Sequence, residues 1–165
     1  MDNKEEFNML MDAAELGNPE AQNHLGALFA TGSGVVKNEN EAAKWYRKAA
    51  EQGHAMAQCN LGVMYSSGRG VSKNNVEAAK WYLKAAAQGD AEAQFLLGVV
   101  LYQGLGVPKN NTKSIYWSRK AAIQGHAKAQ MNMGTMYSAG LCHWAVQNQP
   151  GVGGSKPAGF IDPPV

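Results

Sequence analysis

Glycine recurs along this chain at a fixed interval, and that interval constrains the fold more than any other feature of the sequence. Three glycine columns each repeat every 36 residues: Gly17, Gly53, Gly89 and Gly125; Gly26, Gly62, Gly98 and Gly134; and Gly32, Gly68, Gly104 and Gly140. Trp45, Trp81 and Trp117 keep the same spacing. A period of this length is typical of arrays of small units, in which each unit buries its apolar face only against its neighbours.

Each unit contains two segments with helical periodicity. In the first segment of the first unit, Leu25 and Phe29 lie on one apolar stripe. Gly32 or Gly34 is expected to end this helix, because glycine adopts the left-handed conformation without a Cβ clash. Asn38 precedes the second segment and is the predicted N-cap. We therefore predict an all-α fold, a right-handed α-solenoid of antiparallel helix pairs with about seven helices.

The glycine inside each first helix requires its own explanation. Gly26 costs about 1 kcal/mol relative to alanine in a helix interior, yet glycine returns at this position in every unit. We expect the second helix to approach the backbone so closely at this point that no side chain fits.

The repeats are predicted to form one domain over residues 1–140. Its predicted parts are a lone second helix at 3–16, full units at 18–52, 54–88 and 90–124, and a half unit at 126–139. The remaining residues, 141–165, hold four of the six prolines and several glycines. This composition predicts an irregular tail.

The repeated columns resemble the Sel-one-like repeat, a family related to the tetratricopeptide repeats. In the second unit the matching residues are Ala57, Leu61, Gly62, Tyr65, Gly68, Gly70, Val71, Ala78, Trp81, Tyr82, Lys84, Ala85 and Ala86. The resemblance covers roughly residues 1–140. It implies a curved helical scaffold that mediates protein–protein interactions and does not identify the partner.

One branch of this family is secreted and joins its helices with a cysteine pair in every unit. The equivalent columns of this chain hold Ala50 with Gln58, Ala86 with Gln94, and Ala122 with Gln130. Because none of these residues is cysteine, the resemblance implies neither the disulfides nor the secretion of that branch.

Charge and hydropathy exclude several classes of partner. The chain carries 15 basic and 13 acidic side chains, for a net charge of +2, without a basic run of the kind that nucleic-acid binders carry. No segment approaches the roughly 20 apolar residues that span a membrane. The polar N-terminal residues lack the pattern of a signal peptide. We therefore expect a cytoplasmic protein that binds neither nucleic acid nor membrane.

The histidines do not indicate a catalytic or metal site. His54 and His126 share a column but lie two units apart, whereas catalysis and metal binding need partners within a few ångströms. We interpret both as exposed residues at helix starts. No metal and no cofactor are expected, and no nucleophile with a base, or pair of carboxylates, suggests an enzyme such as a hydrolase.

A ligand is expected on the concave face, where variable side chains of the first helices lie at helical spacing. Columns that pack the fold stay constant between units, whereas these columns change from one unit to the next. The predicted groove residues are Asn23, Met56, Cys59, Glu92, Phe95, Tyr102 and Met131. Methionine and aromatic side chains suit adaptable recognition of a peptide or helix. Packing between units is the alternative role for any one of them.

Self-association is the alternative function. The half unit at 126–139 lacks a partner helix, so Met133, Met136 and Tyr137 are expected to be exposed. Apolar faces of this kind are usually covered. Either the tail folds back over this face, with Leu141, Trp144 or Phe160 as the cover, or a second chain covers it, in which case the protein is a homodimer through its C-terminal end.

Overall fold

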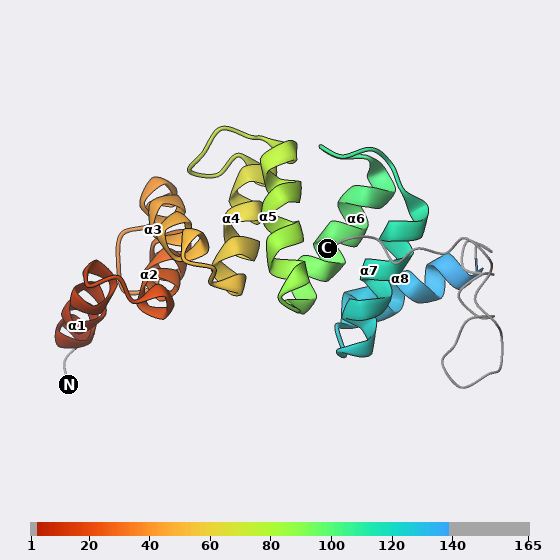
Figure 1. Ribbon diagram of the computed structural model, residues 1–165. Helices are drawn as coiled ribbons and strands as arrows, with labels where there is room; N and C mark the ends of the chain where they lie inside the picture. The colour runs from red at the N-terminus through yellow and green to blue at the C-terminus, as the bar shows by residue number, and fades with distance from the viewer. Residues whose placement is uncertain (1–2, 139–165) are drawn as a thin grey trace.

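The computed structural model describes residues 3–138, which form eight helices and no strand (Figure 1). The helices are α1 (Asn3–Glu15), α2 (Pro19–Thr31), α3 (Glu39–Glu51), α4 (Ala55–Ser67), α5 (Asn75–Ala87), α6 (Ala91–Gln103), α7 (Asn111–Ile123) and α8 (Ala127–Ser138). The sequence predicted about seven helices. The described residues form eight: a lone helix, three pairs and the first helix of a half unit. The predicted tail at 141–165 lies outside the described residues.

The helix boundaries follow the signals that the sequence carries. Gly32 ends α2 with φ 78°, in the left-handed region, and its N–H donates to the carbonyl of Leu28. Asn38 caps α3 because its side-chain oxygen accepts hydrogen bonds from the backbone N–H groups of Asn40 and Glu41, each at 3.1 Å. The equivalent asparagines cap α5 and α7, so the predicted N-caps are confirmed.

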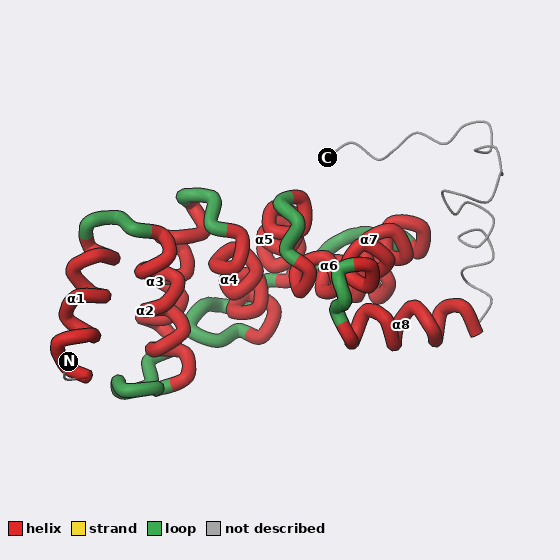
Figure 2. The backbone as a smooth tube through the Cα atoms, turned by 90° about the horizontal axis from the view of Figure 1, so that it is seen from below, coloured by secondary structure: helices red, strands yellow, loops and turns green. Residues whose placement is uncertain are grey.

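The helices succeed one another along an elongated molecule, as the view from below shows (Figure 2). Each helix packs against the helix before it and the helix after it, and contact is most extensive within the pairs α2–α3, α4–α5 and α6–α7. Leu25 and Leu61 are fully buried, and Leu97 is 3% exposed at the same position of the next unit. Burying each such leucine contributes about 1.5–3 kcal/mol. The fold is therefore an α-solenoid whose core is divided into small clusters, one for each neighbouring pair of units.

The glycine inside the first helix of each full unit meets one side-chain position of the second helix: a tyrosine ring at Gly26 and Gly62, and Ser118 at Gly98. A Cβ at Gly26 would lie 2.6 Å from the ring of Tyr46, and a Cβ at Gly62 would lie 2.6 Å from the ring of Tyr82. The close approach predicted for this column is confirmed. Gly134 of α8 differs, since nothing in the described part of the chain lies within 4 Å of its added Cβ.

In the second and third full units, the turn between the two helices passes over the start of the previous unit's second helix. At Gly70, with φ 65°, an added Cβ would overlap the carbonyl of Glu39 at the start of α3. Gly106 meets Asn75 in the same way one unit later. Gly34 has a similar φ of 73°, yet no described atom lies within 4 Å of its added Cβ.

Buried glutamines tie successive units together. Gln58 Nε2 donates to the carbonyl of Ala50 at 3.1 Å, and Gln58 Oε1 accepts from Gln88 Nε2 at 2.8 Å. Gln22 and Gln94 repeat both bonds in their own units. The three buried amides are thus satisfied, as buried polar groups generally are. These bonds join the columns of Ala50 and Gln58, and neither column holds cysteine in this chain.

Candidate protein-binding surface

The predicted groove residues separate by accessibility, and the first group is open to a ligand. Met56 on α4 is 55% exposed, Tyr102 on α6 is 39% exposed and Met131 on α8 is 69% exposed. The side chain of Glu92, in the first turn of α6, is 50% exposed. We call these four residues the first-helix surface. Three of them are large apolar side chains, which water solvates poorly.

Two of the predicted groove residues are buried between units. Asn23 is 7% exposed; its amide nitrogen lies 3.7 Å from the sulfur of Met56, and its amide oxygen accepts from Asn60 at 3.2 Å. Cys59 is 4% exposed, and burial together with the nearby carboxylates of Asp90 and Glu92 raises the pKa of its thiol. Neither side chain contributes to the accessible surface, because the next first helix covers it.

Phe95 belongs to a contact between two units. Its ring stacks on the imidazole of His126 with a centroid distance of 4.8 Å, and His126 Nε2 lies 2.7 Å from a carboxylate oxygen of Glu92. His126 Nδ1 accepts the backbone N–H of Ala129 and so caps α8. The packing role that the sequence left open therefore applies to Phe95, while the carboxylate of Glu92 remains accessible.

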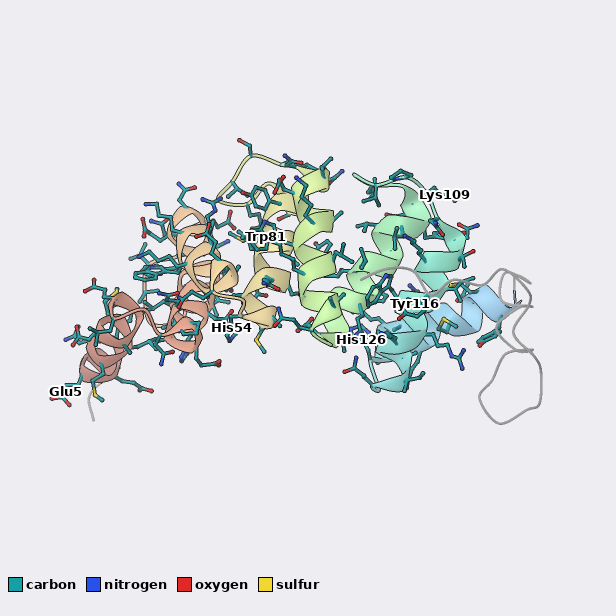
Figure 3. All side chains as sticks on the ribbon, viewed as in Figure 1. Glu5, His54, Trp81, Lys109, Tyr116 and His126 are labelled. Carbon is teal, nitrogen blue, oxygen red and sulfur yellow. The ribbon has the colours of Figure 1, made fainter. Side chains whose placement is uncertain are left out.

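His54 makes two of these three contacts two units earlier. Its Nδ1 accepts from the backbone N–H of Ala57, and its Nε2 lies 2.8 Å from a carboxylate oxygen of Glu20. Figure 3 places His54 and His126 along the same edge of the ribbon. The side chains are only 16% and 14% exposed, so the prediction that both are exposed is wrong. They do begin helices, and each also links its unit to the preceding one.

The histidine–glutamate pair is missing where the unit at 54–88 meets the unit at 90–124; we call such a boundary between units a junction. Asp90 replaces histidine as the cap of α6, accepting from the N–H of Ala93 at 2.7 Å, and Met56 replaces the glutamate. Met56 is 55% exposed, and its sulfur accepts a long contact from the amide of Asn23 at 3.7 Å. These histidine–glutamate contacts could have been found in the sequence, because each histidine follows its glutamate by 34 residues.

The last helix is partly covered. Met133 is 6% exposed and packs against Ile115 of α7, so the prediction that it is exposed is wrong. The first helix of a unit rests on the second helix of the unit before it, and α7 provides that contact. Tyr137 is 40% exposed, as the sequence predicted. Leu141, Trp144 and Phe160, which the sequence suggested as a cover, lie outside the described residues.

Other kinds of site are not seen within residues 3–138. No three His, Cys, Asp or Glu side chains of this segment gather closely enough to hold a metal ion. None of its helices combines the length and the hydropathy that crossing a membrane would require.

Comparison with known families agrees with this architecture. The model of the Sel1 repeat matches residues 19–54, 55–90, 91–126 and 127–149. The chain belongs to the Sel1 repeat family. Proteins of this family are generally scaffolds for interactions between proteins and are generally non-catalytic, and the α-solenoid seen here is their common fold. No curated protein sequence matches the chain.

Solved structures of Sel1 repeat proteins superpose on most of this chain. The protective antigen c5321 of uropathogenic Escherichia coli, which displays the same repeat fold, is 37% identical over 84% of this chain, with a TM-score of 0.81. A Sel1 repeat protein from Oxalobacter formigenes is 46% identical over 81% of the chain, with a TM-score of 0.75. The match spans 30% of the first protein and 55% of the second.

A cysteine-rich protein of known structure is similar in fold. Helicobacter pylori cysteine rich protein B is 26% identical over 78% of this chain and 92% of its own, with a TM-score of 0.61. Among residues 3–138 of the present chain, the single cysteine is Cys59, which is free and buried. Glutamine amides and apolar packing hold the junctions between the units of this Sel1 repeat protein.

Proposed function

We propose that this Sel1 repeat protein is a non-catalytic scaffold that binds a peptide or helix of another protein on its concave face, through the first-helix surface. The observation that carries the proposal is the exposure of large apolar side chains at columns that vary between units. Met56, Tyr102 and Met131 are exposed although the columns that build the fold stay constant.

The chemistry of these side chains favours a protein ligand. Thioether and phenol groups supply apolar contact area that adapts to the shape of a partner. Glu92 adds a carboxylate that is already oriented by His126 at 2.7 Å. Tyr102 is similarly positioned, because the ammonium of Lys109 lies 5.2 Å from its ring centroid. Preorganised side chains bind with a smaller entropic cost.

A capture experiment tests this function. The full chain, its Tyr102→Ser/Met131→Ser variant and a control Ile123→Ser variant are immobilised, and proteins retained from lysate of the source organism are quantified by mass spectrometry. Ile123 is 74% exposed on the second helix α7, so the control removes a comparable apolar side chain from another surface. We expect at least one protein to be retained by wild type and control and lost from the double variant. Equal retention by all three chains contradicts the proposal.

Self-association through the C-terminal end is a second candidate, and Gly134 favours it. At this position of the earlier units a side chain of the second helix (Tyr46, Tyr82 or Ser118) fills the space, whereas no described atom lies within 4 Å of the added Cβ of Gly134. Tyr137 and Met131 are exposed on the same helix. A second copy of the chain would cover these side chains.

For this candidate we expect light scattering at high micromolar concentration to give twice the 17.6 kDa mass of one chain. The Tyr137→Lys variant should return to the single-chain mass, because a lysine ammonium in an apolar interface is costly to desolvate. Wild-type protein that scatters as one chain rules out the dimer.

A further inference from the structure

A cavity of about 440 Å³ lies between the second helices α5 and α7, with α6 behind it. Leu83 from α5, Leu101 from α6 and Trp117 from α7 form its apolar wall. Leu83 remains 44% exposed. Sites for small ligands and inserted side chains typically measure about 300–1,000 Å³. We call this site the α5–α7 cavity; it contains none of the residues of the first-helix surface.

The preceding repeat shows how the same position looks when it is filled. One unit earlier, Arg47 and Tyr65 occupy the columns of Leu83 and Leu101. Arg47 Nη2 donates to the hydroxyl of Tyr65 at 2.9 Å, and the guanidinium lies 5.9 Å from the ring centroid. Two long side chains therefore bridge the junction between α3 and α4. Two leucines cannot form this bond, and they leave an apolar hollow on an otherwise equivalent backbone.

The rim of the α5–α7 cavity is cationic. Lys80, Lys113 and Lys120 line it, and no acidic residue does. Lys80 Nζ is already paired with Glu77 at 2.6 Å, and Lys120 Nζ lies 5.2 Å from the ring centroid of Trp117. Among residues 3–138, no carboxylate pairs with the ammonium of Lys113. One unit earlier its column holds Glu77, so the sign of the charge is reversed here.

We propose that the α5–α7 cavity binds a short acidic segment of a partner protein. One apolar side chain of that segment, the size of leucine, inserts between Leu83, Leu101 and Trp117. Flanking carboxylates meet Lys113 and Lys120. The apolar wall supplies the buried anchor, and the cationic rim selects acidic over basic sequences. This site stands independently of the first-helix surface, so either one can fail without the other.

The test uses peptides of known sequence and the full chain. The probe is acetyl-Asp-Asp-Leu-Asp-Glu-amide; one control peptide carries serine for leucine and another carries lysine for every acidic residue. Binding is followed by NMR titration of the leucine methyl groups and the Trp117 indole. We expect saturable shifts at Leu83, Leu101 and Trp117 with the probe. The serine peptide should bind at least about tenfold more weakly, because it loses the buried anchor. The lysine peptide should not bind.

Two variants, each built from side chains that the chain already uses one unit earlier, provide matched tests. Leu83→Arg/Leu101→Tyr introduces the side-chain pair that Arg47 and Tyr65 form one unit earlier. This filled variant should bind the probe at least about tenfold more weakly. Lys113→Glu restores the earlier charge and should weaken binding of the probe about threefold to tenfold. Unchanged far-UV circular dichroism spectra check that both variants fold.

Three results would overturn the proposal: no saturable binding of the probe, equal binding of the serine peptide, or equal binding by the filled variant. A fourth outcome assigns the cavity to this chain itself. If a peptide of residues 158–164, which contains Phe160, Ile161 and Asp162, binds more tightly than the acidic probe, the occupant is the chain's own C-terminal segment and not a partner.

Discussion

Replacing Gly70 with alanine is expected to lower the free energy of unfolding by about 2–5 kcal/mol. Two effects add. An L-residue held at φ 65° costs about 1–2 kcal/mol. The new methyl group would also overlap the carbonyl of Glu39, a backbone atom that cannot turn aside. Overpacking of this kind costs about 1–3 kcal/mol more. Urea unfolding followed by circular dichroism measures the sum.

Gly34→Ala is the matched control. Its φ of 73° imposes the same backbone penalty, but no described atom lies within 4 Å of the added Cβ. We expect this variant to lose about 1–2 kcal/mol, from the backbone conformation alone. The difference between the two variants isolates the contact between units. Equal losses would show that the turn does not press on the neighbouring unit in solution.

Gly62→Ala is expected to destabilise the protein even though alanine is the better helix former. Alanine gains about 1 kcal/mol over glycine in a helix interior. At Gly62, however, its Cβ would lie 2.6 Å from the ring of Tyr82 and 3.3 Å from the carbonyl of Ala78. Overpacking costs about 1–3 kcal/mol. We expect a net loss of up to about 2 kcal/mol in the free energy of unfolding, measured by urea unfolding.

Gly134→Ala tests the same substitution where the described residues leave space. With no described atom within 4 Å of the new Cβ, only the helical preference of alanine remains, and stability should rise by about 0.5–1 kcal/mol. A gain at Gly62 would contradict the close packing of α4 on α5. A loss at Gly134 would mean that a second chain, or residues beyond Ser138, covers α8.

The fold could be predicted from sequence because its determinants are local and repeated. Gly32 stops a helix through its own backbone conformation, and Asn38 starts one through its own side chain. Each signal acts within a few residues, and each returns unit after unit. The period also predicted that Gly26 would meet another helix. It did not indicate which side chain would fill the space, because that choice depends on how the two helices cross.

The candidate site was predicted less completely, because variation between units does not report exposure. Asn23, Cys59 and Phe95 occupy one column with Met131, yet only Met131 is exposed. Each first helix is followed by another that covers this column, and α8 is the last helix among the described residues. A helical stripe specifies which residues share a face, but the next unit decides whether that face is open.

The α5–α7 cavity was missed for a related reason. The change from Arg47 to Leu83 is visible once the units are aligned. Its consequence required the hydrogen bond between Arg47 and Tyr65, whose columns are 18 residues apart. Only the structure indicates that these two columns face each other across a junction.

Each helix packs on the helices next to it in the chain, and this arrangement determines how the protein can fold during synthesis. The most extensive contacts of α2 and α3 are with each other and with the helices next to the pair, α1 and α4. The entropy lost in closing such short loops is small, and chains with local contacts fold fast. Packing can therefore begin as soon as Glu51 has left the ribosome, before most of the chain has been translated. Each later unit then adds to an end that is already formed, so a partly synthesised chain exposes one unfinished junction at a time.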